Sequence, residues 1–169
     1  MDALLRLFWG ICIFKKGPEE VPASLPLLLI LLLINLILEL SLGLSVYPLK
    51  ESLLLSLISF LTLVSLTYIW LLLYRHTSRL LQTVIAFTGV NLLTNLLIFL
   101  PLTISWRSGL MVDTSFALIN LLALIWILSI YAHIYRRALS IYFFLGFALA
   151  LTYFVSFSAL SELVVAGVK

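Results

Sequence analysis

The sequence predicts an all-α integral membrane protein, in which a short interfacial helix precedes a bundle of five transmembrane helices and the N-terminus faces the cytoplasm. Three observations predict this fold class. Of the 169 residues, 64% are hydrophobic and only 10% are charged, whereas soluble domains average nearer ~45–50% apolar and ~25% charged. The hydrophobic residues form long runs without charge. These runs are rich in leucine, lack strict alternation and exceed the ~9–11 residues of a membrane β-strand.

The same composition excludes several classes of protein. Five helices of roughly 20 residues use about 100 residues, so almost nothing remains for a separate soluble domain. An ordinary water-soluble enzyme, a disordered tail and a nucleic-acid-binding module with a basic face are therefore excluded. We expect no nucleic-acid partner.

The N-terminal segment, residues 1–16, is expected to be an interfacial amphipathic helix. Leu4, Phe8 and Ile11 supply an apolar face, and Arg6 and Lys15 are polar. The segment is too short to cross a bilayer, so it should lie along the surface. Residues 17–24 form a Gly/Pro linker, since glycine and proline interrupt helices.

Charge-free runs define the transmembrane domain, residues 25–160. An ionised side chain at the centre of the bilayer costs about 2.5–3.5 kcal/mol even on insertion scales, so charges should mark the helix ends. Only the first span must tolerate an internal charge, Glu39. Residues 161–169 are expected to form a short C-terminal tail. The five predicted spans are residues 25–46, 51–74, 80–102, 114–134 and 138–159.

Lysine and arginine predict the orientation and a basic surface. Seven of the ten would lie on the side of the N-terminus, which we therefore expect to be cytoplasmic. Gathered on one face, such residues would attract anionic membrane lipid by about 1 kcal/mol each. The alternative is that they only enforce the topology. The predicted cytoplasmic basic surface comprises Lys15, Lys16, Arg75, Arg79, Arg136 and Arg137.

The second candidate site is polar and lies inside the membrane. Glu39 follows Asn35 by four residues, which places both side chains on one face of the first span. Asn91 and Asn95 repeat this spacing on the third span, and Asn120 on the fourth span is a further candidate. An acidic group at this depth indicates a proton or ligand site. The alternative is interhelical hydrogen bonding, worth about 0.6 kcal/mol per bond.

Catalytic and metal-binding patterns are missing. Cys12 is the single cysteine, so neither a disulfide framework nor a cysteine metal cluster can form within the chain, and whether it is modified stays open. His76 and His133 lie near predicted span ends without metal-ligand spacing. We therefore expect no enzyme activity, no metal and no cofactor.

The chain resembles a group of small, uncharacterised bacterial inner-membrane proteins over most of its length. The likeness is carried by residues 17–24 before the first span, by Arg79-Leu80-Leu81-Gln82-Thr83 with Ala86 and Gly89, and by Trp126 followed by His133, Arg136 and Ala138. In architecture it is more remotely similar to the Yip family, five-span proteins linked to membrane traffic. Both resemblances imply an accessory or partner-binding role in a bacterial inner membrane.

These features favour a non-enzymatic membrane protein that binds a protein partner, associates with itself, or organises lipid through its basic surface. The main alternative is a small transporter or channel subunit that uses the Glu39 site. Against it, five spans contain no internal two-fold repeat of the kind many transporters show. A membrane enzyme acting on lipids ranks last, because paired acid, base or metal groups are missing.

Overall fold

A computed structural model describes residues 2–110 and 112–168. Over these residues the chain is helical, without strands. Five helical stretches are long and apolar enough to cross a membrane, which confirms the predicted number and supports an integral membrane protein. The α-helices are α1 (Asp2–Cys12), α2 (Leu25–Gly43), α3 (Leu49–Leu73), α4 (Leu80–Thr94), α5 (Leu100–Arg107), α6 (Asp113–Leu139) and α7 (Phe143–Val168). The short turns are η1 (Pro18–Glu20), η2 (Thr77–Arg79) and the π-turn η3 (Asn95–Phe99).

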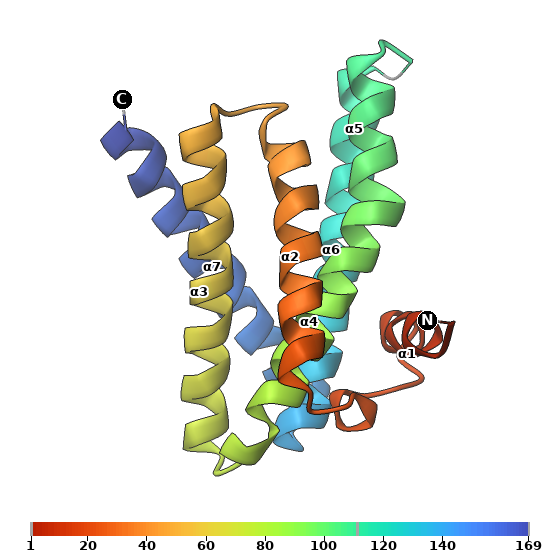
Figure 1. Cartoon of the computed structure of the whole chain (residues 1–169), viewed down its shortest axis with the longest axis vertical. Helices are drawn as coiled ribbons and strands as arrows, with labels where there is room; N and C mark the ends of the chain where they lie inside the picture. Colours follow the sequence, from red (N-terminus) through yellow and green to blue (C-terminus); the bar gives the residue numbers. More distant parts are fainter. Residues whose placement is uncertain (1, 111, 169) are drawn as a thin grey trace.

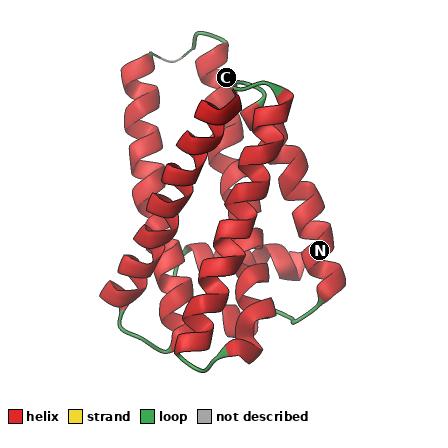
Figure 2. Ribbon diagram, turned by 90° about the vertical axis from the view of Figure 1, so that its left-hand side faces the viewer, coloured by secondary structure: helices red, strands yellow, loops and turns green. Residues whose placement is uncertain are grey.

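The long helices run alternately up and down (Figure 1). Helix α4 is the central element and packs against α1, α2, α3 and α6. Helix α7 packs along α6 and crosses behind α3, and it ends at the top of the bundle in Figure 1. Figure 2 shows that the connections between the long helices are short loops at the two ends of the bundle. We call the lower end in Figure 1 the basic end, because it holds Arg75, Arg79, Arg136 and Arg137.

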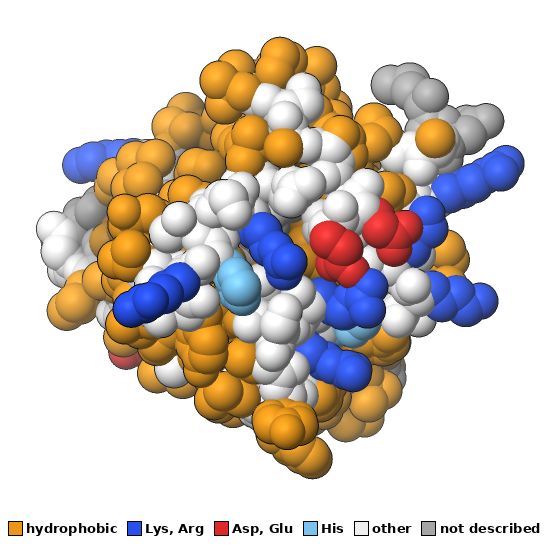
Figure 3. All heavy atoms as spheres, turned by 90° about the horizontal axis from the view of Figure 1, so that it is seen from below, with side chains coloured by type: hydrophobic (Ala, Val, Ile, Leu, Met, Phe, Trp, Pro, Cys, Tyr) orange, Lys and Arg blue, Asp and Glu red, His pale blue; other side chains and the backbone are white. Residues whose placement is uncertain are grey.

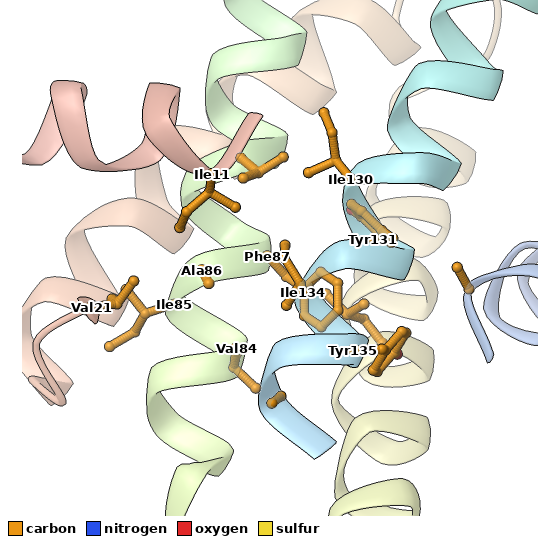
Figure 4. Packing of buried hydrophobic residues seen from close by; sticks show 14 of the residues in the cluster. Ile11, Val21, Val84, Ile85, Ala86, Phe87, Ile130, Tyr131, Ile134 and Tyr135 are labelled. Carbon is orange, nitrogen blue, oxygen red and sulfur yellow. The ribbon is translucent and has the colours of Figure 1, made fainter. Parts of the chain in front are cut away.

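The hydrophobic core lies toward the basic end, where α1, α4 and α6 meet (Figure 4). Ile85 and Phe87 of α4 and Ile130, Ile134 and Tyr135 of α6 are almost completely buried. The Phe87 ring contacts the rings of Tyr131 and Tyr135, with centroids 4.7 and 5.0 Å apart. On the outer faces of the helices, many leucines and isoleucines are exposed, as expected where helices face lipid.

Helix α1 lies across the bundle and is firmly packed against it. Phe8, Ile11 and Cys12 are 3%, 0% and 1% exposed. A Cβ atom at Gly89 of α4 would overlap the Phe8 ring, so glycine is needed for this close approach. Most of the predicted interfacial segment 1–16 is therefore helical, and its apolar face is docked on α4. Met1 lies outside the described residues.

The helix in this segment ends at Cys12, earlier than the predicted residue 16. Phe14 adopts a positive φ of 62°, and the backbone N–H groups of Lys15 and Lys16 both donate to the Gly10 carbonyl, at 2.9 and 3.1 Å. This turn satisfies the Gly10 carbonyl near the end of α1 and stops the helix. The linker is then held in place, because Gln82 Nε2 donates to the Val21 carbonyl at 3.1 Å.

Four predicted span ends are wrong by five residues or more. The third span continues through η3 and α5 to Arg107 rather than 102. The fourth span continues to Leu139 rather than 134. The fifth begins at Phe143, not 138, and continues to Val168, so the predicted tail 161–169 is helical as far as it is described. The prediction placed the span ends at charged residues, but a helix can include charged residues in its last turn. Arg136 and Arg137 lie in the last turn of α6, where their positive charge complements the helix dipole.

The π-turn η3 accommodates Pro101 within the third span. A proline ring clashes with the carbonyl four residues earlier in a regular α-helix and supplies no N–H donor. Over Asn95–Phe99 the chain widens instead, and the Leu100 N–H bonds to the Asn95 carbonyl. The helix therefore continues past the proline.

Candidate functional site

A cavity of about 400 Å³ lies between α2 and α3. Helices α4, α6 and α7 complete its wall, and we refer to it as the α2/α3 cavity. Rim residues Leu36, Leu53 and Leu57 are 38%, 41% and 54% exposed, so the cavity opens to the side of the bundle. Its polar lining residues are Asn35, Glu39, Ser56, Ser59, Thr88, Asn91, Tyr131 and Tyr153, and leucines and Phe60 supply the rest.

Glu39 is the acidic group of this cavity. Its Oε1 atom accepts a hydrogen bond from Asn91 Nδ2 at 2.8 Å, across the contact between α2 and α4. Ser56 of α3 lies beside the same carboxyl group. Among the described residues, the two ion pairs lie at the basic end, and neither involves Glu39. The carboxyl group therefore has polar neighbours but no cationic partner among the residues that the structure describes.

Asn35 lies one helical turn from Glu39 and presents an unused acceptor. Its Nδ2 group donates to the Leu31 carbonyl at 3.0 Å and to the Thr88 carbonyl at 2.9 Å. These two bonds fix the orientation of the amide. Its Oδ1 atom has no hydrogen-bond partner among the described residues, although Asn35 is only 4% exposed and lines the cavity. A buried polar atom without a partner is costly, and a hydrogen-bond donor in the cavity would satisfy it.

A hydroxyl pair forms a further polar wall of the cavity. Ser59 Oγ and Tyr153 Oη lie 3.0 Å apart and link α3 to α7. The hydroxyl groups of Thr67 and Tyr135 make a similar link between α3 and α6, at 3.2 Å. The α2/α3 cavity thus combines an apolar rim with a carboxyl group, an amide oxygen and hydroxyl groups inside. Such a surface suits an amphipathic molecule that carries hydrogen-bond donors.

The structure brings together some of the polar residues singled out in the sequence. Asn35, Glu39 and Asn91 line one cavity. Asn95 lies at the start of η3, and Asn120 donates to the Phe116 carbonyl of its own helix at 2.8 Å; neither residue lines the cavity. Ser56, Ser59 and Tyr153 also line the cavity, and none of them was singled out from the sequence as a candidate site residue. The four-residue spacing of Asn35 and Glu39 was informative, but nothing in the sequence shows which tyrosine faces them.

The predicted basic residues share one end of the molecule but do not form one free surface (Figure 3). Lys16 pairs with Glu20 at 3.3 Å, and Arg137 pairs with Glu19. Arg79 donates to the carbonyl groups of Arg137 and Ala138 and so caps the end of α6. Lys15 and Arg75 lie exposed. Only Arg79, Arg136 and Arg137 line a common cleft.

His133 has a structural contact. Its Nε2 atom lies 2.9 Å from the Lys16 carbonyl, and its ring meets the edge of Phe14. Within residues 2–110 and 112–168, no group of three or more His, Cys, Asp or Glu side chains could hold a metal ion.

Comparison with known proteins adds no family to this description. No family model, curated protein or solved structure matches the chain significantly. The resemblances to small bacterial inner-membrane proteins and to the Yip family therefore stay predictions.

Proposed function

We propose that the protein is a non-enzymatic integral membrane protein that binds an amphipathic molecule in the α2/α3 cavity and acts as an accessory subunit. The ligand carries an amine or another hydrogen-bond donor at one end and an apolar chain at the other. The observation that carries this proposal is that one cavity holds both Glu39, which has no ion-pair partner in the described part of the chain, and the unused Oδ1 atom of Asn35. Ionisable groups inside membranes commonly mark binding sites.

The geometry of the cavity gives the ligand its orientation. Glu39 lies four residues from the last residue of α2, hence about 6 Å from the end of that helix. A donor group bound there would lie near the membrane boundary opposite the basic end. The apolar chain would lie against the exposed leucines of α2 and α3. The ligand would therefore enter sideways from the bilayer.

The proposed sidedness follows from the positive charges. Arg75, Arg79, Arg136 and Arg137 lie at the basic end, whereas Lys50 and Arg107 lie at the other. We infer that the basic end faces the cytoplasm of a bacterial inner membrane. Membrane-impermeant labelling of tags fused to the two termini tests this: they should be reachable from opposite sides.

Photo-crosslinking tests the binding site. Purified protein in nanodiscs is treated with a photoreactive long-chain primary amine, and the labelled peptides are mapped. We expect the probe to label α2 and α3. A long-chain amine should compete with the probe and reduce this labelling, whereas a fatty acid should not, because the Glu39 carboxyl group repels another anion.

Glu39→Gln is the informative variant, because the glutamine carbonyl can still accept from Asn91 while the charge is lost. Its labelling should fall by about tenfold, the factor for about 1.4 kcal/mol of lost interaction. Glu162→Gln is the matched control, since Glu162 lies on α7 outside this cavity. Equal labelling of the wild type and Glu39→Gln would contradict the proposal.

The alternative is a small transporter or channel subunit that uses the same polar site. Uptake of the amine into proteoliposomes distinguishes the two. Binding without uptake supports an accessory protein, whereas uptake that depends on Glu39 supports transport.

A further inference from the structure

A second cavity lies at the basic end, far from the α2/α3 cavity in the fold. It is a cleft of about 420 Å³ between η2 and the end of α6, with η1 at its edge. We call it the arginine cleft. Its lining residues are Glu19, Arg79, Arg136, Arg137, Ser140 and Ile141. Figure 3 shows basic side chains around acidic ones on this face of the molecule.

The charges of the arginine cleft do not balance. It holds three guanidinium groups and one carboxylate, that of Glu19, a formal excess of two positive charges. Glu19 pairs with Arg137. Arg136 has no ion pair in the part of the chain that the structure describes. The single carboxylate of Glu19 therefore does not neutralise the positive charge of the cleft, which can accept a further anionic group.

The cleft is also preorganised. Arg79 Nη1 donates to the carbonyls of Arg137 and Ala138 at 3.5 and 3.2 Å, which holds this guanidinium group against the end of α6. Ser140, which caps the end of α6, has a left-handed conformation with φ 58° and ψ 42° and lines the cleft together with Ile141. The linker that carries Glu19 is anchored by the hydrogen bond from Gln82 to Val21. Arg79 and the linker are therefore already held in place, and only the ion pair between Glu19 and Arg137 must open when another anion binds to Arg137.

We propose that the arginine cleft binds the phosphate group of an anionic phospholipid and that Glu19 occupies part of this site in the free protein. Guanidinium groups match phosphate oxygens with paired hydrogen bonds. The cleft lies at an end of the bundle, where lipid headgroups meet the helix ends. Glu19 and the phosphate then compete for Arg137, so the acid on the linker sets how tightly the lipid is held.

Two neighbouring acids provide the test. Glu19 and Glu20 lie side by side in η1, but Glu20 pairs with Lys16 and does not line the cleft. Glu19→Gln and Glu20→Gln therefore remove the same charge from the same turn. Attraction by net charge alone would make the two variants equal, whereas competition in the cleft would distinguish them.

The measurement is lipid binding by the purified full chain in detergent, followed by native mass spectrometry with phosphatidylglycerol or phosphatidylcholine. We expect Glu19→Gln to bind phosphatidylglycerol about fivefold more tightly than the wild type, the factor for one released arginine, and Glu20→Gln to stay near the wild type. Adding Arg136→Gln to Glu19→Gln should reverse the gain. Phosphatidylcholine should bind all variants equally, and inorganic phosphate at the same concentration should not compete.

Two results would overturn the proposal. Equal phosphatidylglycerol binding by Glu19→Gln and Glu20→Gln would show that the cleft does not select the lipid. Competition by inorganic phosphate as effective as that of the lipid would assign the cleft to a soluble anion instead.

Discussion

Replacing Gly89 by valine should detach α1 from the bundle. The new side chain would overlap the Phe8 ring, so Phe8 must leave its pocket. Full burial of a phenylalanine side chain is worth about 1.5–3 kcal/mol, and Ile11 and Cys12 share the same buried face. We therefore expect α1 to be undocked for most of the time, while α2 to α7 keep their packing.

Cys12 reports on this change, because it is the single cysteine of the chain. Burial raises the pKa of its thiol from 9.0 to about 11. Only the thiolate reacts with an alkylating reagent, so at pH 8 undocking should speed alkylation by about 100-fold through ionisation alone. The added accessibility of a side chain that is 1% exposed increases the factor further. The difference should shrink as the pH rises toward 11.

Gly167→Val is the control, since nothing lies within 4 Å of a Cβ atom there. Its alkylation rate should match that of the wild type. If Cys12 in Gly89→Val reacts as slowly as in the wild type, α1 does not depend on the contact between Phe8 and Gly89.

Two further predictions concern helix packing. A Cβ atom at Gly146 would overlap the Ala132 carbonyl oxygen of α6, so Gly146→Val should lower the free energy of unfolding by about 1–3 kcal/mol. Denaturation in mixed micelles measures this change, with Gly167→Val as the control. An unchanged midpoint would refute close α6–α7 contact at this point. Tyr135→Phe loses the hydroxyl bond to Thr67 and should cost about 0.6 kcal/mol. A loss above about 2 kcal/mol would mean that more than this bond was disturbed.

The number and approximate position of the long helices could be predicted from the sequence. Charge-free leucine-rich runs cannot satisfy their backbone in lipid except as helices, so composition and charge suffice for this level. The ends could not be predicted equally well. The prediction ended each span at a charged residue, but Arg107, Arg136 and Glu162 all lie within helices. A helix continues beyond its apolar part as long as its backbone hydrogen bonds are satisfied.

The polar site was predictable only in part. The spacing of Asn35 and Glu39 showed a shared face, and the contact of α2 with α4 then places Asn91 against Glu39. The rotation of α6 and α7 decides that Asn120 points elsewhere and that Tyr153 faces the cavity. Hydrophobic patterning does not determine this rotation, since both faces of these helices are apolar. The internal pairing of Glu19 with Arg137 likewise depends on how the linker folds back.

Native mass spectrometry of protein extracted directly from its membrane into lipid nanodiscs tests the central claim most directly. The wild type should retain an amphipathic molecule with an amine or other donor group, and Glu39→Gln should lose it while Glu162→Gln keeps it. The claim would be contradicted if all three proteins carried the same bound species in equal amounts, or if the retained molecule lacked a donor group.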